Sequence, residues 1–404
     1  MSEDLSFAIS ARNWLPATGL VVLGAGAAFY ELYADPQRAW PTLLLNGFYV
    51  TSLAVSAIFF LAVQRATGAR WSASLRRIPE ALMLALPVVA FLMLVLFVGR
   101  DTIFPWTRPD AFDHTPSFAG KIQYLRMPWL VARTVAALIL WTVFALLMRR
   151  ASLDQDERPE MALILHRRLT RYAIVFIAVF AVTFTLMSFD WIISLEPDWF
   201  STMFAVYVFA GTFVQGIAAI TLAAVLLRRS SFSWRNCISE DQLHDLGKMM
   251  FAFSTFWAYI WTCQYLLIWY GNIPEEITYY LPRTNGPWLY FFALNLMMNW
   301  VIPFVVLLSA SRKRSPKILA AMSIVLLLGH WLDLYLLIMP TFHSTPSLVL
   351  PEVVIAAGYM ALLFLLFVNA LARAPIVPLN DPILNYEELA HDHDVIHRPF
   401  GVNL

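Results

Sequence analysis

The chain alternates between long apolar stretches and short polar connections. Ten of these stretches contain about twenty mostly apolar residues each. A helix of that length crosses the roughly 30 Å of hydrocarbon in a membrane, and a helix satisfies its own backbone hydrogen bonds in lipid. We therefore predict ten transmembrane helices, at residues 14–33, 42–63, 79–99, 127–148, 171–193, 199–227, 246–270, 287–309, 317–339 and 348–371.

The composition agrees with this pattern. Hydrophobic residues make up 60% of the 404 positions and charged residues only 14%, whereas about a quarter of a soluble globular chain is charged. The polar residues are too few to cover a soluble globule, so a water-soluble enzyme, a disordered chain and a disulfide scaffold are excluded. The predicted fold class is an all-α integral membrane protein. Residues 1–404 are expected to form one polytopic domain in the lipid membrane, and no nucleic-acid partner is expected.

The basic residues predict the orientation of the helices. Eighteen Lys and Arg residues lie in the even-numbered connections and six in the odd-numbered ones. Basic residues gather in cytoplasmic loops, so the even-numbered connections and both termini are predicted to be cytoplasmic. The tail at residues 372–404 is then cytoplasmic as well, and the chain is expected to cross its membrane many times.

Cysteine and histidine are scarce. Cys237 and Cys263 form no C-x-x-C or C-x-x-C-H motif, so this chain is expected to bind neither an iron–sulfur cluster nor a c-type haem by itself. The tail has three histidines and two aspartates whose spacing matches no defined metal site: His391, Asp392, His393, Asp394 and His397. We interpret it as a solvated tail or a segment that docks a partner, and we expect no metal and no cofactor bound by this chain.

Four ionisable residues lie well inside the predicted spans, away from the ends. Arg133 and Asp190 lie on consecutive helices at similar depth, which favours a structural ion pair between them. His330 and Asp333 are three residues apart and share a helix face. Buried ionisable groups in membranes often serve a function. Asp333 has no basic residue at its depth in the neighbouring predicted spans, so both a proton-exchanging role and a hydrogen-bonded packing role remain open for the pair.

Other polar residues lie at similar depth on the neighbouring helices. Such residues often only join membrane helices by hydrogen bonds, but their presence on four helices suggests a partly hydrated polar path for protons from the cytoplasm towards Asp333. The residues of this hypothetical path are Asp333, His330, Tyr259, Thr255, Thr262, Asn295, Asn299, Gln215 and Lys248. No catalytic residue is assigned.

Three segments resemble one known family. They are SFDWIISLEPDWFSTMF at 188–204, FWAYIWTCQYLLIWYGNIPEE at 256–276 and HWLDLYLLIMP at 330–340. They are similar to the second, smaller polytopic membrane subunit of bacterial alternative complex III, a quinol:cytochrome c oxidoreductase, within the superfamily of polysulfide and nitrite reductase membrane subunits. The resemblance covers essentially the whole chain.

The resemblance implies two four-helix bundles, formed by predicted helices 2–5 and 6–9, with helices 1 and 10 at the periphery. It implies a pentahaem cytochrome c subunit, a periplasmic iron–sulfur subunit, a sister polytopic subunit with the quinol site, and small haem or anchor subunits as partners. Haem c, iron–sulfur clusters and quinol would then belong to those partners, and electrons would pass to cytochrome c or to a terminal oxidase. This chain would be a non-catalytic subunit that supports the assembly and conducts protons through helices 6–9.

Three other interpretations remain open. In the first, the chain is a quinone-binding membrane subunit of a related reductase, and Phe48, Tyr49, Trp129 and Trp141 are available to line a pocket in the first bundle. In the second, it is a secondary transporter, for which repeated helix interruptions would be typical. In the third, it is a purely structural membrane anchor, in which every buried polar group joins helices.

Overall fold

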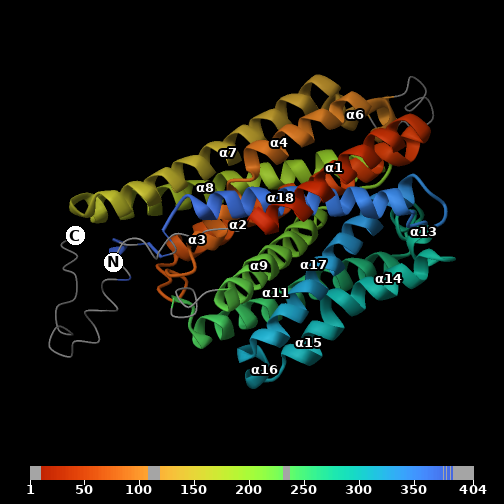
Figure 1. Cartoon of the computed structure of the whole chain (residues 1–404). Coiled ribbons are helices and arrows are strands. Elements are labelled where there is room, and N and C mark those ends of the chain that lie inside the picture. Colours follow the sequence, from red (N-terminus) through yellow and green to blue (C-terminus); the bar gives the residue numbers. More distant parts are fainter. Residues whose placement is uncertain are drawn as a thin grey trace.

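The computed structural model describes residues 11–107, 119–230, 237–375, 377–378, 380–382 and 384, and every regular element among them is a helix (Figure 1). The histidine-rich part of the tail, residues 391–397, lies outside the described residues. Within the described ranges, nine helical segments are long and apolar enough to cross a membrane. They are Trp14–Ala34, Pro36–Ala66, Arg77–Ile103, Met127–Glu157, Pro159–Leu195, Phe204–Ser230, Trp288–Leu307, Pro316–Thr341 and Leu350–Ala372.

The stretch predicted at 246–270 is also helical. It forms α11 (Glu240–Gly271), which has 32 residues, begins with a capping box between Ser239 and Gln242, and ends at Asn272 in the left-handed conformation. It is absent from the nine apolar segments of the described chain. The described residues therefore contain nine candidate spans where the sequence predicts ten.

The remaining helices are assigned as follows. They are α1 (Ala11–Ala34), α2 (Pro36–Ala66), α3 (Arg77–Met83), α4 (Leu86–Val95), α5 (Arg100–Ile103), α6 (Ala119–Leu125), α7 (Met127–Glu157), α8 (Ala162–Trp191), α9 (Phe204–Ser230), α12 (Pro274–Ile277), α13 (Tyr280–Thr284), α14 (Trp288–Leu296), α15 (Ile302–Leu307), α16 (Ala310–Arg314), α17 (Pro316–Ile338) and α18 (Leu350–Ala372).

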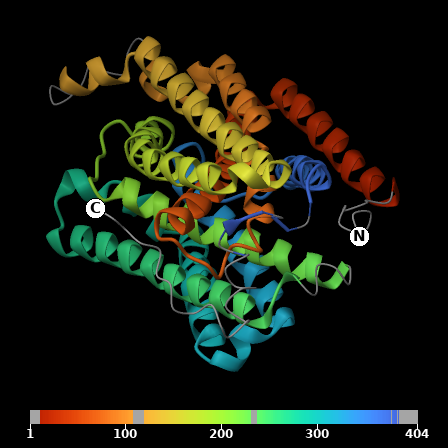
Figure 2. The ribbon, with the colours of Figure 1, turned by 90° about the vertical axis from the view of Figure 1, so that its left-hand side faces the viewer.

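The long helices form two groups that meet at α2. In one group α2 packs on α3, α4 and α8, and α7 packs on α4 and α8. In the other, α9 packs on α11 and α17, and α14 and α15 lie beside α11 and α17. Figure 2 shows the orange and yellow helices on one side of the molecule and the green and cyan helices on the other. Because α2 contacts both α8 and α9, most of its length is buried.

The first and last long helices pack against each other. Gly24 of α1 faces Gly358 of α18, and a Cβ atom on Gly24 would lie 2.6 Å from the Gly358 Cα atom. Small residues at a crossing let two membrane helices approach closely, so this pair of glycines accounts for the tight contact between α1 and α18.

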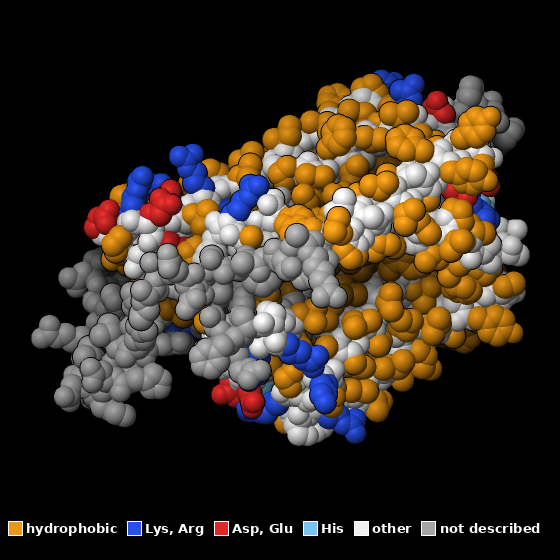
Figure 3. Space-filling model, viewed as in Figure 1, with side chains coloured by type: hydrophobic (Ala, Val, Ile, Leu, Met, Phe, Trp, Pro, Cys, Tyr) orange, Lys and Arg blue, Asp and Glu red, His pale blue; other side chains and the backbone are white. Residues whose placement is uncertain are grey.

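The surface has the distribution of side chains that a membrane protein needs. Figure 3 shows hydrophobic side chains over the middle of the face in view, whereas Lys, Arg, Asp and Glu lie towards its two ends. Large apolar residues are strongly exposed on helices from both groups, including Leu15, Val98, Ile139, Leu267 and Leu308. An exposed apolar surface of this extent is stable in lipid and not in water, so the described chain is a multi-pass all-α membrane protein.

Two of the predicted spans are interrupted. The span at 79–99 breaks between α3 and α4, just before Pro87, and the span at 287–309 contains a π-helical turn at Met297–Val301 between α14 and α15. Pro303 has no N–H to donate to the carbonyl four residues earlier, which belongs to Asn299. The proline therefore explains why the regular hydrogen-bond ladder changes at this point. Single π turns are frequent at functional sites.

A buried charge cluster closes the predicted cytoplasmic end of the first group. The carboxylate of Glu80 accepts hydrogen bonds from Arg77 Nη1 at 2.6 Å, Arg149 Nη1 at 2.8 Å and Ser152 Oγ at 2.6 Å, and it lies 3.2 Å from Arg76 Nε. All five side chains are buried. Three guanidinium groups thus share this one carboxylate, and Arg76 and Arg77 also pair with Asp381 and Asp156.

Part of the tail is attached to the same cluster. Asp381 is 1% exposed, forms an ion pair with Arg76, and accepts from Arg65 Nη2 at 3.3 Å. Burial alone would lower the pKa of Arg76, but the carboxylates of Asp381 and Glu80 outweigh burial and raise it. The tail near Asp381 is therefore packed on the helices rather than solvated.

Candidate functional site

Asp333 lies at the centre of the second group of helices. The residue is 1% exposed, and its carboxylate accepts hydrogen bonds from the Tyr207 hydroxyl, from Asn295 Nδ2 at 2.7 Å and from Trp257 Nε1 at 3.2 Å. These donors come from α9, α14 and α11, while Asp333 itself belongs to α17. The carboxylate is therefore the point at which four helices are joined by hydrogen bonds.

His330 lies one turn before Asp333 on α17. Its Nδ1 is 3.6 Å from Asp333 Oδ2, and neither ring nitrogen has a hydrogen-bond partner among the described residues. The side chain is fully buried. Buried polar atoms are nearly always paired, so the two unpaired ring nitrogens leave this imidazole available for further hydrogen bonds beside the carboxylate.

The position of the His330 ring depends on a glycine in the facing helix. A Cβ atom on Gly211 of α9 would lie 2.3 Å from His330 Cε1 and 2.6 Å from His330 Nδ1. We expect Gly211→Ala to push the imidazole out of place and to lower the free energy of unfolding by about 1–3 kcal/mol. Unfolding in mixed micelles with increasing dodecyl sulfate measures the change.

Gly19→Ala is the matched control for this substitution. Gly19 also lies in a long helix, but a Cβ atom there would meet nothing within 4 Å. Without a clash, alanine favours a helix over glycine by about 1 kcal/mol. Equal effects of the two substitutions would contradict the close packing of His330 on Gly211.

Two asparagines extend the polar contacts of Asp333 along α14 and the π turn. Asn299 Nδ2 donates to Asn295 Oδ1 at 2.6 Å and to the Asn295 carbonyl oxygen at 3.2 Å. Asn295 and Asn299 are 1% and 2% exposed. The i, i+4 pair predicted from the sequence therefore forms a hydrogen-bonded line that leads from Asp333 towards the predicted cytoplasmic side.

Gln215 connects this region to the first group of helices. Its Nε2 donates to Ser52 Oγ at 2.6 Å and to the Tyr49 carbonyl oxygen at 3.2 Å, both on α2. The Tyr49 ring centroid lies 6.3 Å from that of His330. The Oε1 atom of Gln215 is buried and has no hydrogen-bond partner in the described part of the chain, so it is another acceptor close to the region of His330.

The polar face predicted on α11 points away from Asp333. Tyr259 is 61% exposed, and Thr255 and Thr262 are half-buried. The Thr255 hydroxyl donates to the Phe251 carbonyl oxygen of its own helix at 2.9 Å. Threonine and tyrosine at i, i+4, i+7 share a helix face, but spacing alone does not determine which face is buried, and here the buried face carries Trp257 instead.

Lys248 is also remote from the contacts of Asp333. Its side chain is 53% exposed and forms an ion pair with Asp245 at 2.5 Å. It lies near the start of α11, where it contributes a surface charge. The structure thus joins Asn295 to Asp333 and Asn299 to Asn295, and places His330 beside the carboxylate. It gives Tyr259, Thr255, Thr262 and Lys248 other surroundings.

Tyr207 and Trp257 are the two partners of Asp333 that sequence reasoning missed. Neither was assigned a role from the sequence, although a phenol and an indole each have a polar atom that finds a partner when buried. Trp257 lies within the segment 256–276, one of the three that carry the family resemblance. Tyr207 lies three residues after the end of another, 188–204. Their position beside those segments was the available signal.

The predicted ion pair between Arg133 and Asp190 is confirmed. Arg133 Nε donates to Asp190 Oδ2 and Nη2 donates to Asp190 Oδ1, each at 2.8 Å. The guanidinium also donates to the Tyr124 carbonyl oxygen at 3.0 Å and lies over the Tyr124 ring. A bidentate pair of this kind fixes α7 against α8.

A buried arginine lies at the predicted outer end of α17. Arg283 Nε and Nη2 donate to the carbonyl oxygens of Leu336 and Leu337 at 2.9 and 3.1 Å, and Nη2 also donates to Glu196 Oε1 at 2.6 Å. Burial would lower the pKa of Arg283, but neighbouring Tyr279 and Glu196 outweigh burial and raise it. Arg283 thus caps the helix that carries Asp333.

Tyr279 lies between Arg283 and the region of Asp333. Burial raises the pKa of its phenol, and the negative charges of Glu196 and Asp333 act in the same direction against the opposing effect of Arg283. Its hydroxyl has no hydrogen-bond partner among the described residues. Tyr279 is therefore a neutral phenol placed between the buried carboxylate and Glu196, whose side chain is 22% exposed.

Neither metal ligands nor known relatives assign the site. Among the described residues no group of three or more His, Cys, Asp or Glu side chains is placed to hold a metal ion, and Cys237 and Cys263 are unbonded to each other. No protein-family model and no curated protein matches the sequence. The functional conclusion therefore depends on the residues themselves.

Proposed function

We propose that this chain is the smaller polytopic subunit of a quinol:cytochrome c oxidoreductase of the alternative complex III kind and that it conducts protons through Asp333. In this proposal the chain carries no redox cofactor and lies in a bacterial cytoplasmic membrane with both termini in the cytoplasm. Ten spans in two four-helix bundles, with α1 and α18 peripheral, are part of the same proposal. The three segments at 188–204, 256–276 and 330–340 support the family.

The observation that carries the proton-conducting role is the surroundings of Asp333. A carboxylate buried in a membrane bundle is costly, and its contacts here are three neutral donors and an imidazole rather than a Lys or Arg. Ionisable side chains inside a membrane bundle commonly belong to proton relays, so these surroundings support a proton-exchanging role.

The contacts around Asp333 extend in both directions along the bundle. Towards the predicted cytoplasmic side lie Asn295, Asn299 and His330, and towards the predicted outer side lie Tyr207, Tyr279 and the partly exposed Glu196. Asparagine, tyrosine and histidine side chains donate and accept hydrogen bonds. They are able to relay a proton through intervening water when the path hydrates.

The partners in this proposal follow from the family. They are a pentahaem cytochrome c subunit, a periplasmic iron–sulfur subunit, a sister polytopic subunit that binds quinol, and small haem or anchor subunits, with cytochrome c or a terminal oxidase as electron acceptor. Haem c and iron–sulfur clusters are assigned to those partners because Cys237 and Cys263 belong to no binding motif, and quinol is assigned to the sister subunit by the family resemblance.

Purification from native membranes tests the assembly. A tagged full-length chain is expected to co-purify with c-type haem, non-haem iron and an activity that reduces cytochrome c with quinol. Absorption spectra, metal analysis and a quinol oxidation assay on the same preparation provide the three readouts. A monodisperse chain free of haem and iron, isolated in the mildest detergent that extracts it, would contradict the proposal and favour a transporter.

A structural anchor is the second candidate, and one observation favours it. Both oxygens of Asp333 are occupied by donors from three other helices, so the same carboxylate also serves to hold the bundle together. Substitution of Asp333 separates the two candidates, because an anchor needs its hydrogen bonds whereas a proton carrier needs its titration.

A further inference from the structure

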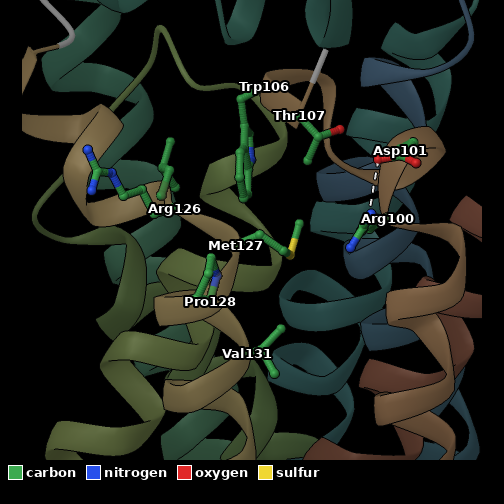
Figure 4. A pocket seen from close by; sticks show the side chains of 9 residues that line it. Arg100, Asp101, Trp106, Thr107, Arg126, Met127, Pro128 and Val131 are labelled. Carbon is green, nitrogen blue, oxygen red and sulfur yellow. Dashed lines mark ion pairs between the residues drawn. The ribbon is translucent and has the colours of Figure 1, made fainter. Parts of the chain in front are cut away.

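A second site lies far from Asp333, at the predicted outer ends of α4, α5 and α7. A pocket of about 800 Å³ is lined by residues of α5, of the turn that follows it, and of the first turn of α7 (Figure 4). The candidate membrane spans Arg77–Ile103 and Met127–Glu157 end and begin beside it. Trp129, 59% exposed, lies in the same turn of α7, as interfacial tryptophans do.

The rim of this pocket is cationic. Arg100 and Arg126 lie on opposite sides of it in Figure 4, and Asp101 forms an ion pair with Arg100 at 3.4 Å. The pocket also includes Met127 and Pro128, the first residues of the 31-residue helix α7. The dipole of this long helix favours an anion at its N-terminal end, although the N–H groups of Trp129 and Leu130 are already bonded to the Arg126 carbonyl oxygen.

A buried donor faces the same pocket. Trp106 is 5% exposed, and its indole Nε1 is buried without a hydrogen-bond partner in the described part of the chain. In Figure 4 the indole stands between Arg126 and Arg100, with its nitrogen on the side of Arg100. A buried N–H of this kind normally has a partner, so the pocket offers one donor that is directed inwards in addition to its cationic rim.

The floor of the pocket is apolar. Leu125, Met127 and Val131 are among its lining residues, and Val131 lies below the two arginines in Figure 4. A small inorganic anion would pair with the rim but would leave this apolar surface uncovered. A ligand that fits both parts has an anionic head and an apolar body, and it reaches the pocket from the boundary of the membrane.

We propose that this pocket binds an anionic phospholipid from the adjacent leaflet. The phosphate pairs with Arg100 and accepts a hydrogen bond from Trp106 Nε1, and its apolar part lies over Met127 and Val131. Arg126 is exposed and points away from Arg100 in Figure 4, and its side chain turns towards the bound phosphate. Arginine is well suited to phosphate because its planar guanidinium donates two parallel hydrogen bonds. The site is independent of the proton path and of the partners proposed above.

Native mass spectrometry of the full-length chain tests this proposal. The protein is equilibrated with equal amounts of phosphatidylglycerol and phosphatidylcholine, and the bound lipids are counted after partial delipidation. We expect wild type to retain phosphatidylglycerol preferentially. Loss of one charge-assisted hydrogen bond, at about 1.5–3 kcal/mol, corresponds to roughly tenfold or more in affinity, so Arg126→Gln, Arg100→Gln and Trp106→Phe should each weaken retention by about tenfold.

Arg167→Gln is the control, because Arg167 is an exposed arginine of α8 outside this pocket. It should retain phosphatidylglycerol as wild type does. Equal retention of the two lipids by wild type, or unchanged retention in all three pocket variants, would overturn the proposal. Displacement of the lipid by inorganic phosphate at comparable concentration would show that the site takes a free anion and would overturn the lipid assignment.

Discussion

Glu80→Gln is expected to lower the free energy of unfolding by about 3–5 kcal/mol, the usual effect of removing one partner from a buried ion pair. Glu80 is 2% exposed and contacts Arg76, Arg77 and Arg149. Glutamine keeps the size of the side chain but removes its charge, so three buried guanidinium groups lose a shared counter-ion. Titration with dodecyl sulfate in mixed micelles, followed by circular dichroism, measures the loss.

Glu160→Gln is the matched control for this substitution. Glu160 is exposed near the same end of the first group of helices, and exposed ion pairs contribute at most about 1 kcal/mol. A Glu80→Gln variant as stable as Glu160→Gln would contradict the structure of the cluster. It would mean that Asp381 and Asp156, which also pair with Arg76 and Arg77, neutralise the cluster without Glu80, or that these arginines face water.

Asp333→Asn is expected to reduce the number of protons translocated per electron to zero while quinol oxidation continues. Asparagine is nearly isosteric, and its carbonyl oxygen still accepts from Tyr207 and Asn295. Its NH₂ group faces the Trp257 N–H, and because both groups are donors, one hydrogen bond is lost at a cost of about 1–3 kcal/mol. The bundle should therefore persist, whereas a group that cannot titrate no longer passes a proton. Proton release and electron transfer, measured together in proteoliposomes of the intact assembly, give the ratio.

Asp241→Asn provides the comparison, because Asp241 is a 79% exposed carboxylate paired with Arg314 at the predicted cytoplasmic surface. Its ratio should equal that of wild type. If Asp333→Asn also pumped protons at the wild-type ratio, the proton-conducting role would be wrong and the structural anchor would remain. A variant that fails to assemble would favour the anchor directly.

The membrane architecture could be predicted from hydropathy because lipid requires long apolar segments. The ends of the helices could not. The predicted span at 127–148 is part of α7, which continues to Glu157, and the predicted span at 171–193 is part of α8, which begins at Ala162. Hydropathy identifies only the lipid-crossing part of a helix, whereas backbone hydrogen bonds continue through polar residues in water.

The site could be predicted only where partners lie close in sequence or on consecutive helices. His330 and Asp333 share a turn, Asn295 and Asn299 share a turn, and the pairing of Arg133 with Asp190 follows from neighbouring helices. The rotation of a helix about its axis is a tertiary property. The sequence therefore predicted that α11 is a helix. The polar pattern that includes Tyr259 did not predict which face of this helix is buried.

The buried charge cluster shows the same limit at longer range. Asp381 lies 316 positions after Arg65 and 305 after Arg76, its two arginine partners. A loop arginine in a sequence looks like a solvated cytoplasmic charge, and only the fold reveals that a distant carboxylate covers it. Counting such charges predicts the orientation of the helices, but it does not predict how much the charges contribute to stability.

The central claim, that Asp333 binds and releases a proton inside the bundle, is tested most directly by infrared difference spectroscopy of the full-length chain in liposomes during a pH titration. The account predicts a carboxyl band that grows as the pH falls, is present in wild type and in Asp241→Asn, and is missing in Asp333→Asn. Identical difference spectra for wild type and Asp333→Asn would contradict it.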